Sequence, residues 1–300
     1  MAGMNEHNSV QQPLVDELVR LGWSYVPGKD LDRQLEQVFV EPEVVDALVR
    51  LNPDVAEVPA RASEVVKLLR NLTFQVDDEG LVETNRDAMS WLRGLQTHKF
   101  VGADVFRPVR LIDFENPANN RFVVADEVSF GSPGNKARFD IVLFVNGLPL
   151  VVGETKTAFK QKVSWITAAN EVADHYETKF APFFTTNVFS FATEGRELMY
   201  GATGARVEHW MTAGPAKDHP LLTDVLAAAR WLLAPATVLK FLNSFTLFET
   251  PEDNSGSASL IKLIARYMQF EAVELMVGRA HEGQSRRGLI YHTQGSGKTL

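Results

Sequence analysis

Apolar side chains recur at helical spacing through much of the first hundred residues. Leu14, Leu18 and Leu21 lie three or four positions apart, and Gly22 ends the segment. The same spacing predicts further helices at about 34–51, 63–72 and 86–94. We interpret the apolar positions as stripes that face a core. The first third of the chain is therefore predicted to be mainly helical.

Short runs rich in β-branched and aromatic residues replace this pattern between about residues 105 and 211. They predict strands at 109–114, 121–130, 139–145, 148–155, 183–192 and 197–200, with one helix at 164–179 between them. Beyond them, helices are expected at 221–245 and 260–279, and a last strand at 288–292. Strands mixed with single helices are typical of an α/β or α+β layer architecture.

The stretch from Glu249 to Ser259 is polar and contains Gly, Pro and Ser, which is typical of a linker. It predicts a first domain over residues 1–250, a linker at 251–259 and the first part of a second domain at 260–300. A chain of 300 residues is long enough for two domains.

Composition narrows the class of protein. Cysteine is absent, which excludes disulfide scaffolds, zinc–thiolate sites and cysteine nucleophiles. The formal net charge of −8 argues against a surface coated with basic residues for nucleic acid, although it leaves room for a local basic groove. We find no secretory signal and no apolar run of about 18 residues, so we expect a cytoplasmic protein that does not span a membrane.

One predicted hairpin carries three charged residues. Asn146-Gly147 is a strong turn signal between two runs that are apolar on both faces, so both strands should lie deep in a sheet. These strands nevertheless bring Asp140, Glu154 and Lys156 into the interior. Burial of such charges is unfavourable unless they pair with one another or bind a metal.

The register of this hairpin decides whether the two carboxylates meet. A two-residue loop would pair Asp140 with Gly153 and turn Glu154 to the opposite face. A three-residue loop with a glycine bulge, or an equivalent bulge near Gly153, would pair Asp140 with Glu154. Adjacent carboxylates repel unless a cation lies between them, so we predict the second register and a site for Mg²⁺ or Mn²⁺. A structural ion network that includes Lys156 is the alternative interpretation.

The order Asp140, Glu154-Thr155-Lys156 resembles the PD-(D/E)xK nuclease signature, with Phe139 in place of its proline. Longer phrases, among them residues 111–120 and 200–202, resemble the R subunit of type I restriction–modification enzymes. This similarity extends over nearly the whole chain. It implies a restriction-endonuclease-like mixed sheet flanked by helices, followed by the start of a RecA-like superfamily 2 helicase domain.

The resemblance also implies a function. It implies an ATP-dependent, type I site-specific deoxyribonuclease that cuts double-stranded DNA with Mg²⁺ after translocation. Asp140 and Glu154 would be the metal ligands and Lys156 the catalytic lysine. The implied partners are a methyltransferase (M) subunit and a specificity (S) subunit that reads the target sequence.

Two departures from the family pattern leave alternatives open. Related nucleases carry Gln-x-x-x-Tyr on the following helix; Tyr176 matches the tyrosine, but Val172 stands at the glutamine position. A helper glutamate often lies on the first helix, and both Glu6 and Glu17 are candidates. A nuclease fold that docks the motor without cutting is one alternative function. A stand-alone ATP-dependent helicase–nuclease is another.

The last residues form a glycine-rich turn after a predicted strand. Successive backbone N–H groups in such a turn, together with the next helix N-terminus, can hold phosphate oxygens. Lys298 would reach the β- and γ-phosphates and the Thr299 hydroxyl would bind Mg²⁺. His292 stands where the first glycine of the usual pattern belongs, yet residues 294–299 resemble motif I of superfamily 2 helicases. The predicted ATP-binding residues are Gly295, Ser296, Gly297, Lys298 and Thr299.

Gln269 resembles the adenine-reading glutamine upstream of motif I in those motors, with a surface-helix glutamine as the alternative. The segment 123–127 resembles a Walker B strand. It precedes the phosphate loop, which is the wrong order for this class, so we interpret it as an ordinary strand end.

Hydrolysis of ATP by a motor needs Walker B carboxylates, a water-positioning group and an arginine finger after the phosphate loop. Residues 1–300 alone are therefore expected to show no measurable ATP hydrolysis in a phosphate-release assay on the purified chain. Robust hydrolysis by these residues would contradict the expectation.

Overall fold

The computed structural model describes residues 7–157, 164–215, 217, 220–251, 259–283 and 287–291. Its α-helices are α1 Gln12–Arg20, α2 Glu41–Leu51, α3 Pro53–Glu57, α4 Arg61–Glu79, α5 Leu81–Leu92, α6 Trp165–Asn170, α7 Glu177–Lys179, α8 Leu222–Leu232, α9 Pro235–Ser244 and α10 Tyr267–Glu282. Two of the described segments are π-helical turns, η1 His7–Gln11 and η4 Glu171–Tyr176. The 3₁₀ turns are η2 Gly28–Asp30, η3 Pro117–Asn119, η5 Ala181–Phe184 and η6 Val207–His209.

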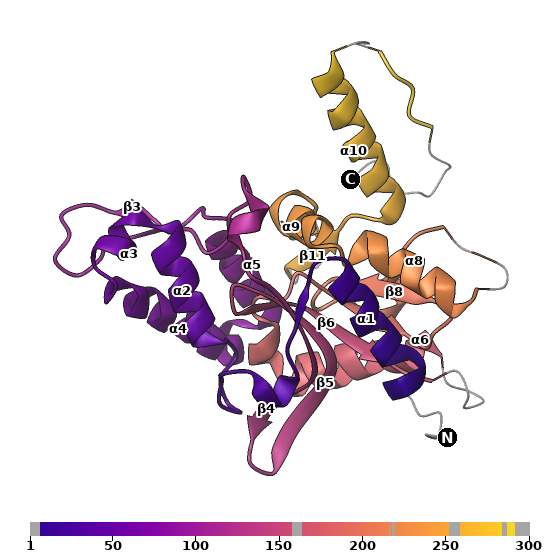
Figure 1. Cartoon of the computed structure of the whole chain (residues 1–300), viewed down its shortest axis with the longest axis horizontal. Helices are drawn as coiled ribbons and strands as arrows, with labels where there is room; N and C mark the ends of the chain where they lie inside the picture. Colours follow the sequence, from indigo (N-terminus) through magenta and orange to yellow (C-terminus); the bar gives the residue numbers. More distant parts are fainter. Residues whose placement is uncertain are drawn as a thin grey trace.

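A seven-stranded sheet lies at the centre of the molecule (Figure 1). The order of its strands is β1-β4-β5-β6-β7-β8-β9. Its strands are β1 Ser24–Tyr25, β4 Phe122–Ser132, β5 Asn135–Val145, β6 Leu148–Thr155, β7 Phe189–Thr193, β8 Leu198–Gly201 and β9 Met211–Thr212. The pairs β1–β4 and β6–β7 are parallel and the others are antiparallel, so the sheet is mixed. Two small sheets pair β2 Thr97–His98 with β3 Arg107–Pro108, and β10 Thr246–Glu249 with β11 Ile261–Ile264.

Helices cover both faces of this sheet. Neighbouring residues of a strand point to opposite faces, so Gly153 and Glu154 face different layers. Gly153 pairs with Phe191, and Phe189 on the same face of β7 packs against Phe241 of α9 with ring centroids 5.2 Å apart. On the Glu154 face, Tyr176 of η4 donates a hydrogen bond to Glu154. The predicted mixed sheet flanked by helices is thus confirmed, and the hairpin β5–β6 is central in it.

The hairpin has the predicted register, but its loop length and the position of its bulge differ from the prediction. Val145 pairs with Leu148, so the loop has two residues, and both take positive φ (51° at Asn146 and 79° at Gly147). The pairing then shifts at Leu150, because Phe144 pairs with Pro149 but Leu143 pairs with Val151. Continuation of the pair Ile141–Gly153 places Asp140 opposite Glu154. The predicted odd-length loop is wrong, and the bulge lies at Leu150 instead of near Gly153.

The turn itself is held from both sides. The Asn146 side chain donates to Leu111 O (2.9 Å) and accepts from the Arg121 N–H (2.8 Å). A Cβ at Gly147 would lie 2.4 Å from Val40 O. Tertiary contacts therefore stabilise the two-residue loop. The unpaired residue that brings Asp140 opposite Glu154 is consequently found further along β6, at Leu150.

Several predicted element boundaries are wrong. The segment 34–40 is irregular, and 109–114 is not a strand because pairing stops at Pro108. The predicted helix 221–245 divides into α8 and α9 at Pro235. Residues 123–127 lie inside β4 instead of at a strand end. The remaining differences are a 3₁₀ turn at the start of 183–192, a strand at the start of 260–279, and no regular structure at 287–291.

The segment after the predicted linker packs on the sheet unit. β11 pairs with β10 across that linker, Tyr200 OH donates to Ala265 O (2.8 Å), and Phe270 packs against Phe241 and Phe245. Beyond this point α10 projects from the molecule (Figure 1). The domain boundaries stay predictions, but residues 261–264 share a hairpin with the preceding domain.

Among the described residues no single helix has both the length and the apolar composition to cross a membrane; α8 and α9 reach them only as a pair bent by 54°, by length and composition alone.

Packing around the hairpin can be tested at Gly153. A Cβ there would lie 2.0 Å from Phe191 Cζ, so Gly153→Ala must displace a fully buried ring. We expect a loss of about 1–3 kcal/mol in the free energy of unfolding, measured by urea denaturation. The matched control is Gly278→Ala on α10, where a Cβ meets nothing within 4 Å and the change should be neutral or slightly stabilising. Equal stability of the two variants would contradict this packing.

Candidate active site

Asp140 lies in β5 with 9% of its surface exposed. Its Oδ2 accepts two hydrogen bonds of 2.8 Å, from the backbone N–H and the hydroxyl of Thr155. Burial raises the pKa of Asp140, and these two donors and the charge of Lys156 oppose that rise. Thr155 therefore holds the Asp140 carboxylate in one orientation, and it lies in β6, the strand that also carries Glu154.

Glu154 faces Asp140 from β6 and is only 2% exposed. Burial and then the charge of Asp140 raise the pKa of Glu154 to about 9, although Lys156 opposes the shift. Tyr176 OH donates to Glu154 Oε2 at 3.3 Å. The two acidic side chains thus share one region and destabilise each other's charged form.

Lys156 follows the end of β6, where its backbone N–H donates to Thr193 O (2.8 Å). Its Nζ lies 2.5 Å from Glu154 Oε1 and 2.6 Å from Glu171 Oε2. Burial lowers the pKa of Lys156, but the two carboxylates outweigh it, so the pKa is raised and the side chain stays an ammonium. The predicted trio Asp140, Glu154 and Lys156 is brought together by the structure.

The π-helical turn η4 supplies two more side chains. Tyr176 OH donates to Glu171 Oε1 at 3.0 Å as well as to Glu154. Burial opposes ionisation of Glu171, but the hydrogen bonds of Lys156 and Tyr176 outweigh it and the pKa of Glu171 is lowered. Val172, at the position of the expected glutamine, is fully buried in the core. Tyr176 therefore joins the site, and Glu171 lies where the sequence pattern did not place it.

A further contact comes from the N-terminal turn η1. Gln11 Nε2 donates to the backbone oxygen of Asp140 (3.0 Å) and to Glu127 Oε1 (3.3 Å). Glu127 has φ 51° and forms an ion pair with Arg138. Neither Gln11 nor Glu127 belongs to a recognisable spacing, so only the folded chain shows that they lie beside Asp140.

Glu17 does not reach this site. It lies in α1, where its carboxylate pairs with Arg20 (2.8 Å) and with Arg230 of α8 (2.5 Å). The alternative candidate, Glu6, lies outside the described residues. Glu17, left open above as a candidate helper carboxylate, instead forms ion pairs with two arginines between α1 and α8.

The predicted nucleotide site falls largely outside the described residues. This applies to Gly295, Ser296, Gly297, Lys298 and Thr299, which stay predictions. Gln269 is described: its Oε1 accepts from the Arg266 N–H (2.8 Å) in the first turn of α10. An adenine-reading role for Gln269 also stays a prediction.

The donor set suits a hard cation with few protein ligands. Within the described ranges no group of three or more His, Cys, Asp or Glu is arranged to hold a metal ion. Asp140 and Glu154 supply two carboxylates at opposed positions. Mg²⁺ commonly binds through one or two carboxylates and completes its shell with water and phosphate oxygens. These two residues fit such an ion, whose charge would relieve their mutual repulsion.

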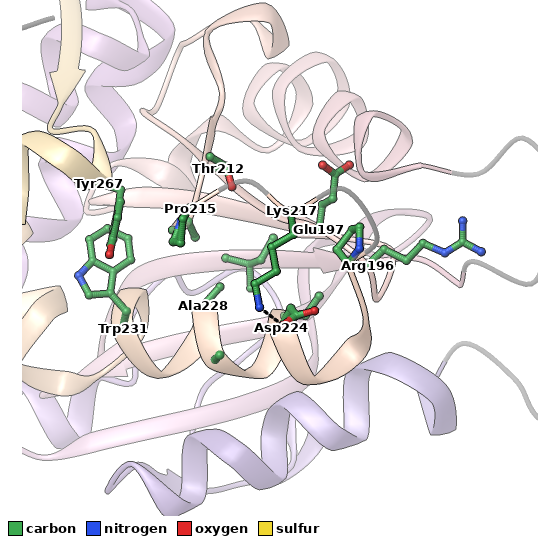
Figure 2. A pocket seen from close by; sticks show the side chains of 15 residues that line it. Arg196, Glu197, Thr212, Pro215, Lys217, Asp224, Ala228, Trp231 and Tyr267 are labelled. Atoms are coloured by element: carbon green, nitrogen blue, oxygen red, sulfur yellow. Dashed lines mark hydrogen bonds and ion pairs between the residues drawn. The ribbon is translucent and has the colours of Figure 1, made fainter. Parts of the chain in front are cut away.

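A separate cavity of about 240 Å³ lies along α8 (Figure 2). Lys217 pairs there with Asp224 at 2.5 Å, and Trp231 and Tyr267 stand at the other end. None of the predicted catalytic residues lines this cavity.

Comparison with known proteins shows the family to which the chain belongs. The family model described as "Type I restriction enzyme R protein N terminus" matches residues 3–209, which include Asp140, Glu154 and Lys156. The chain belongs to this family. It is 31% identical to the type I restriction enzyme HindI endonuclease subunit of Haemophilus influenzae, over 99% of the chain and 29% of that protein.

A second relative is the putative type I restriction enzyme MjaVIIIP endonuclease subunit of Methanocaldococcus jannaschii, 26% identical over 98% of the chain and 28% of that protein. The chain thus spans less than a third of the length of these type I restriction subunits. The mixed sheet flanked by helices fits this family, and the predicted phosphate loop falls beyond the residues that the family model matches.

The Glu17 contacts predict a pH dependence of stability. The hydrogen bond from Arg230, followed by that from Arg20, lowers the pKa of Glu17 below its ordinary 4.5. Because the folded pKa is depressed, this contribution is complete above about pH 4.5 and is lost as the pH falls through the folded pKa. Glu17→Gln should lower the urea midpoint at pH 7 and have a smaller effect at pH 3. A constant difference between the two pH values would argue against the ion pairs.

Proposed function

We propose that this chain carries the Mg²⁺-dependent DNA endonuclease of a type I restriction enzyme R subunit. One observation carries the proposal: Asp140 lies opposite Glu154 on the central hairpin, with Lys156 Nζ 2.5 Å from Glu154. This set and its order along the chain are what the nuclease signature requires. The printed names of the relatives, endonuclease subunits of type I restriction enzymes, support the same activity.

Asp140 and Glu154 would hold the cation, which lowers the pKa of a bound water and stabilises charge on a phosphate. Thr155 orients Asp140 through two hydrogen bonds. Lys156 is kept charged by two carboxylates, so it can stabilise negative charge that develops on the scissile phosphodiester. Tyr176 fixes Glu154 from the helix side.

The wider assembly belongs to the same proposal. ATP would bind at residues 295–299 with Gln269, and translocation along double-stranded DNA would precede the cut. An M subunit and an S subunit would provide methylation and target recognition. Recognition by these partners fits a chain with a net charge of −8. The proposed location is the cytoplasm.

Two lysine variants separate cutting from the motor. In the complete subunit assembled with its partners, Lys156→Ala should lower cleavage of circular DNA at least about a hundredfold and leave translocation intact. Lys298→Ala should abolish both, because the phosphate-binding lysine would be lost. Cleavage is followed on agarose gels with Mg²⁺ and ATP, and translocation by triplex displacement.

Metal binding provides the control for this test. The affinity of the chain for Mn²⁺, measured by titration calorimetry, should fall at least about tenfold in Asp140→Asn and remain in Lys298→Ala. Unchanged affinity in Asp140→Asn, together with no cutting by the wild-type assembly, would favour a nuclease fold that only docks the motor.

A further inference from the structure

The helical segment that starts at Trp165 changes its winding beside the candidate site, where α6 passes into η4. Residues Glu171–Tyr176 form a π-helical turn, in which residues five apart share a face, whereas residues four apart do so in an α-helix. Glu171 and Tyr176 are five apart, and the Tyr176 hydroxyl donates to Glu171 Oε1 at 3.0 Å. The winding therefore brings Glu171 beside the tyrosine, while Val172 is turned into the core.

The Glu171 carboxylate makes a second ion pair with the Lys156 ammonium. Its Oε2 lies 2.6 Å from Lys156 Nζ, and Glu154 Oε1 lies 2.5 Å from the same nitrogen. The Glu154 side chain is 2% exposed and that of Glu171 is 36% exposed, so one carboxylate contacts the ammonium from the interior and the other from the solvent side. Tyr176 OH reaches both carboxylates and ties the two sides together.

We propose that Glu171 is a positioning residue that holds the Lys156 ammonium in place for the cut, and that the π-turn is the feature that brings it there. This inference rests on the proposed endonuclease function. A lysine side chain has four rotatable bonds, so one acceptor restrains its nitrogen poorly. Two acceptors on different elements restrain it, and the loss of one would move the ammonium by an ångström or more.

The role needs an acceptor oxygen at this position and does not need a negative charge. A glutamine side chain has the same length and presents a carbonyl oxygen to Lys156. Glu171→Gln should therefore keep the arrangement, whereas Glu171→Ala removes it. Asp174 is exposed on the same turn and serves as the matched control, through Asp174→Ala.

The test uses the complete subunit with its partners under single-turnover conditions. Glu171→Ala should cut DNA about tenfold to a hundredfold more slowly, since misplacement of a catalytic group by about 1 Å has an effect of this size. Glu171→Gln should cut within about threefold of wild type, and Asp174→Ala should equal wild type. The dissociation constant for DNA and the thermal midpoint should be the same in all four proteins.

A second measurement needs neither metal nor DNA and reports the reactivity of the Lys156 amine directly. Acylation of Lys156 by an N-hydroxysuccinimide ester, quantified by peptide mass spectrometry, should be several-fold faster in Glu171→Ala than in Glu171→Gln, because both variants lose the same charge and only the first loses the acceptor oxygen. Asp174→Ala should be labelled at the wild-type rate. Equal labelling of Glu171→Ala and Glu171→Gln would overturn the inference. Failure of Glu171→Gln to restore cutting would overturn it as well.

The π-turn is tested by shortening the helix. Deletion of Ala173 in the Glu171→Gln background gives Gln-x-x-x-Tyr, which places the same two side chains on one face of an α-helix. We expect cutting within about tenfold of wild type. A folded deletion variant as slow as Glu171→Ala would overturn the role of the turn, and the three substitutions decide the positioning role by themselves.

The outcomes separate the two proposals. If wild type and Lys156→Ala cut equally, or neither cuts, the endonuclease function fails. If wild type cuts, Lys156→Ala does not, and Glu171→Ala cuts as fast as Asp174→Ala, the endonuclease function stands and the positioning role of Glu171 is wrong.

Discussion

The repulsion between the buried carboxylates of Asp140 and Glu154 is the interaction that the other contacts of the candidate site have to offset. Asp140 and Glu154 face each other across the two central strands, where 9% and 2% of their surfaces are exposed. Such a pair is unfavourable unless donors and cations surround it. Thr155, Lys156 and Tyr176 supply those contacts. Thr155 lies in β6, Lys156 follows the end of β6 where its N–H bonds to β7, and Tyr176 lies in the π-turn η4. The apolar faces of β5 and β6 keep water away and strengthen every charge interaction in the site.

Rigid packing behind the site gives these contacts their geometry. The ring centroid of Phe139 lies 5.0 Å from that of Tyr176 and 4.5 Å from that of Phe183. The strand that carries Asp140 and the turn that carries Tyr176 therefore share one aromatic cluster. Phe139 stands where the nuclease signature has proline. A buried phenylalanine takes part in this cluster with its ring and leaves its N–H for the sheet, which a proline cannot do.

The helical segment that carries Tyr176 is also connected to residues beyond the predicted linker. Glu177 follows Tyr176 directly, is buried, and accepts from the Gly204 N–H at 2.8 Å; burial raises its pKa to about 8, although the charge of Lys262 opposes this. Lys262 belongs to β11 and donates to Asn187 O (2.6 Å) and Thr203 Oγ1 (3.2 Å). Residues on both sides of the predicted linker therefore share one buried polar cluster, which explains why β11 is not separate from the sheet unit.

Local sequence determined the central features of this protein. Continuous apolar runs around Asn146-Gly147 predicted a buried hairpin, and the residue order of Asp140, Glu154 and Lys156 indicated which side chains meet in it, because strand periodicity and turn chemistry act over a few residues. Tertiary structure decided the rest. The bulge at Leu150 follows from contacts that hold the turn, and the π-turn that places Glu171 depends on packing of Val172 in the core. Gln11 and Glu17 are six residues apart, yet Gln11 contacts Asp140 of β5 and Glu17 contacts Arg230 of α8. Contacts between residues more than a hundred positions apart leave no periodic trace in the chain, so only the folded molecule shows them.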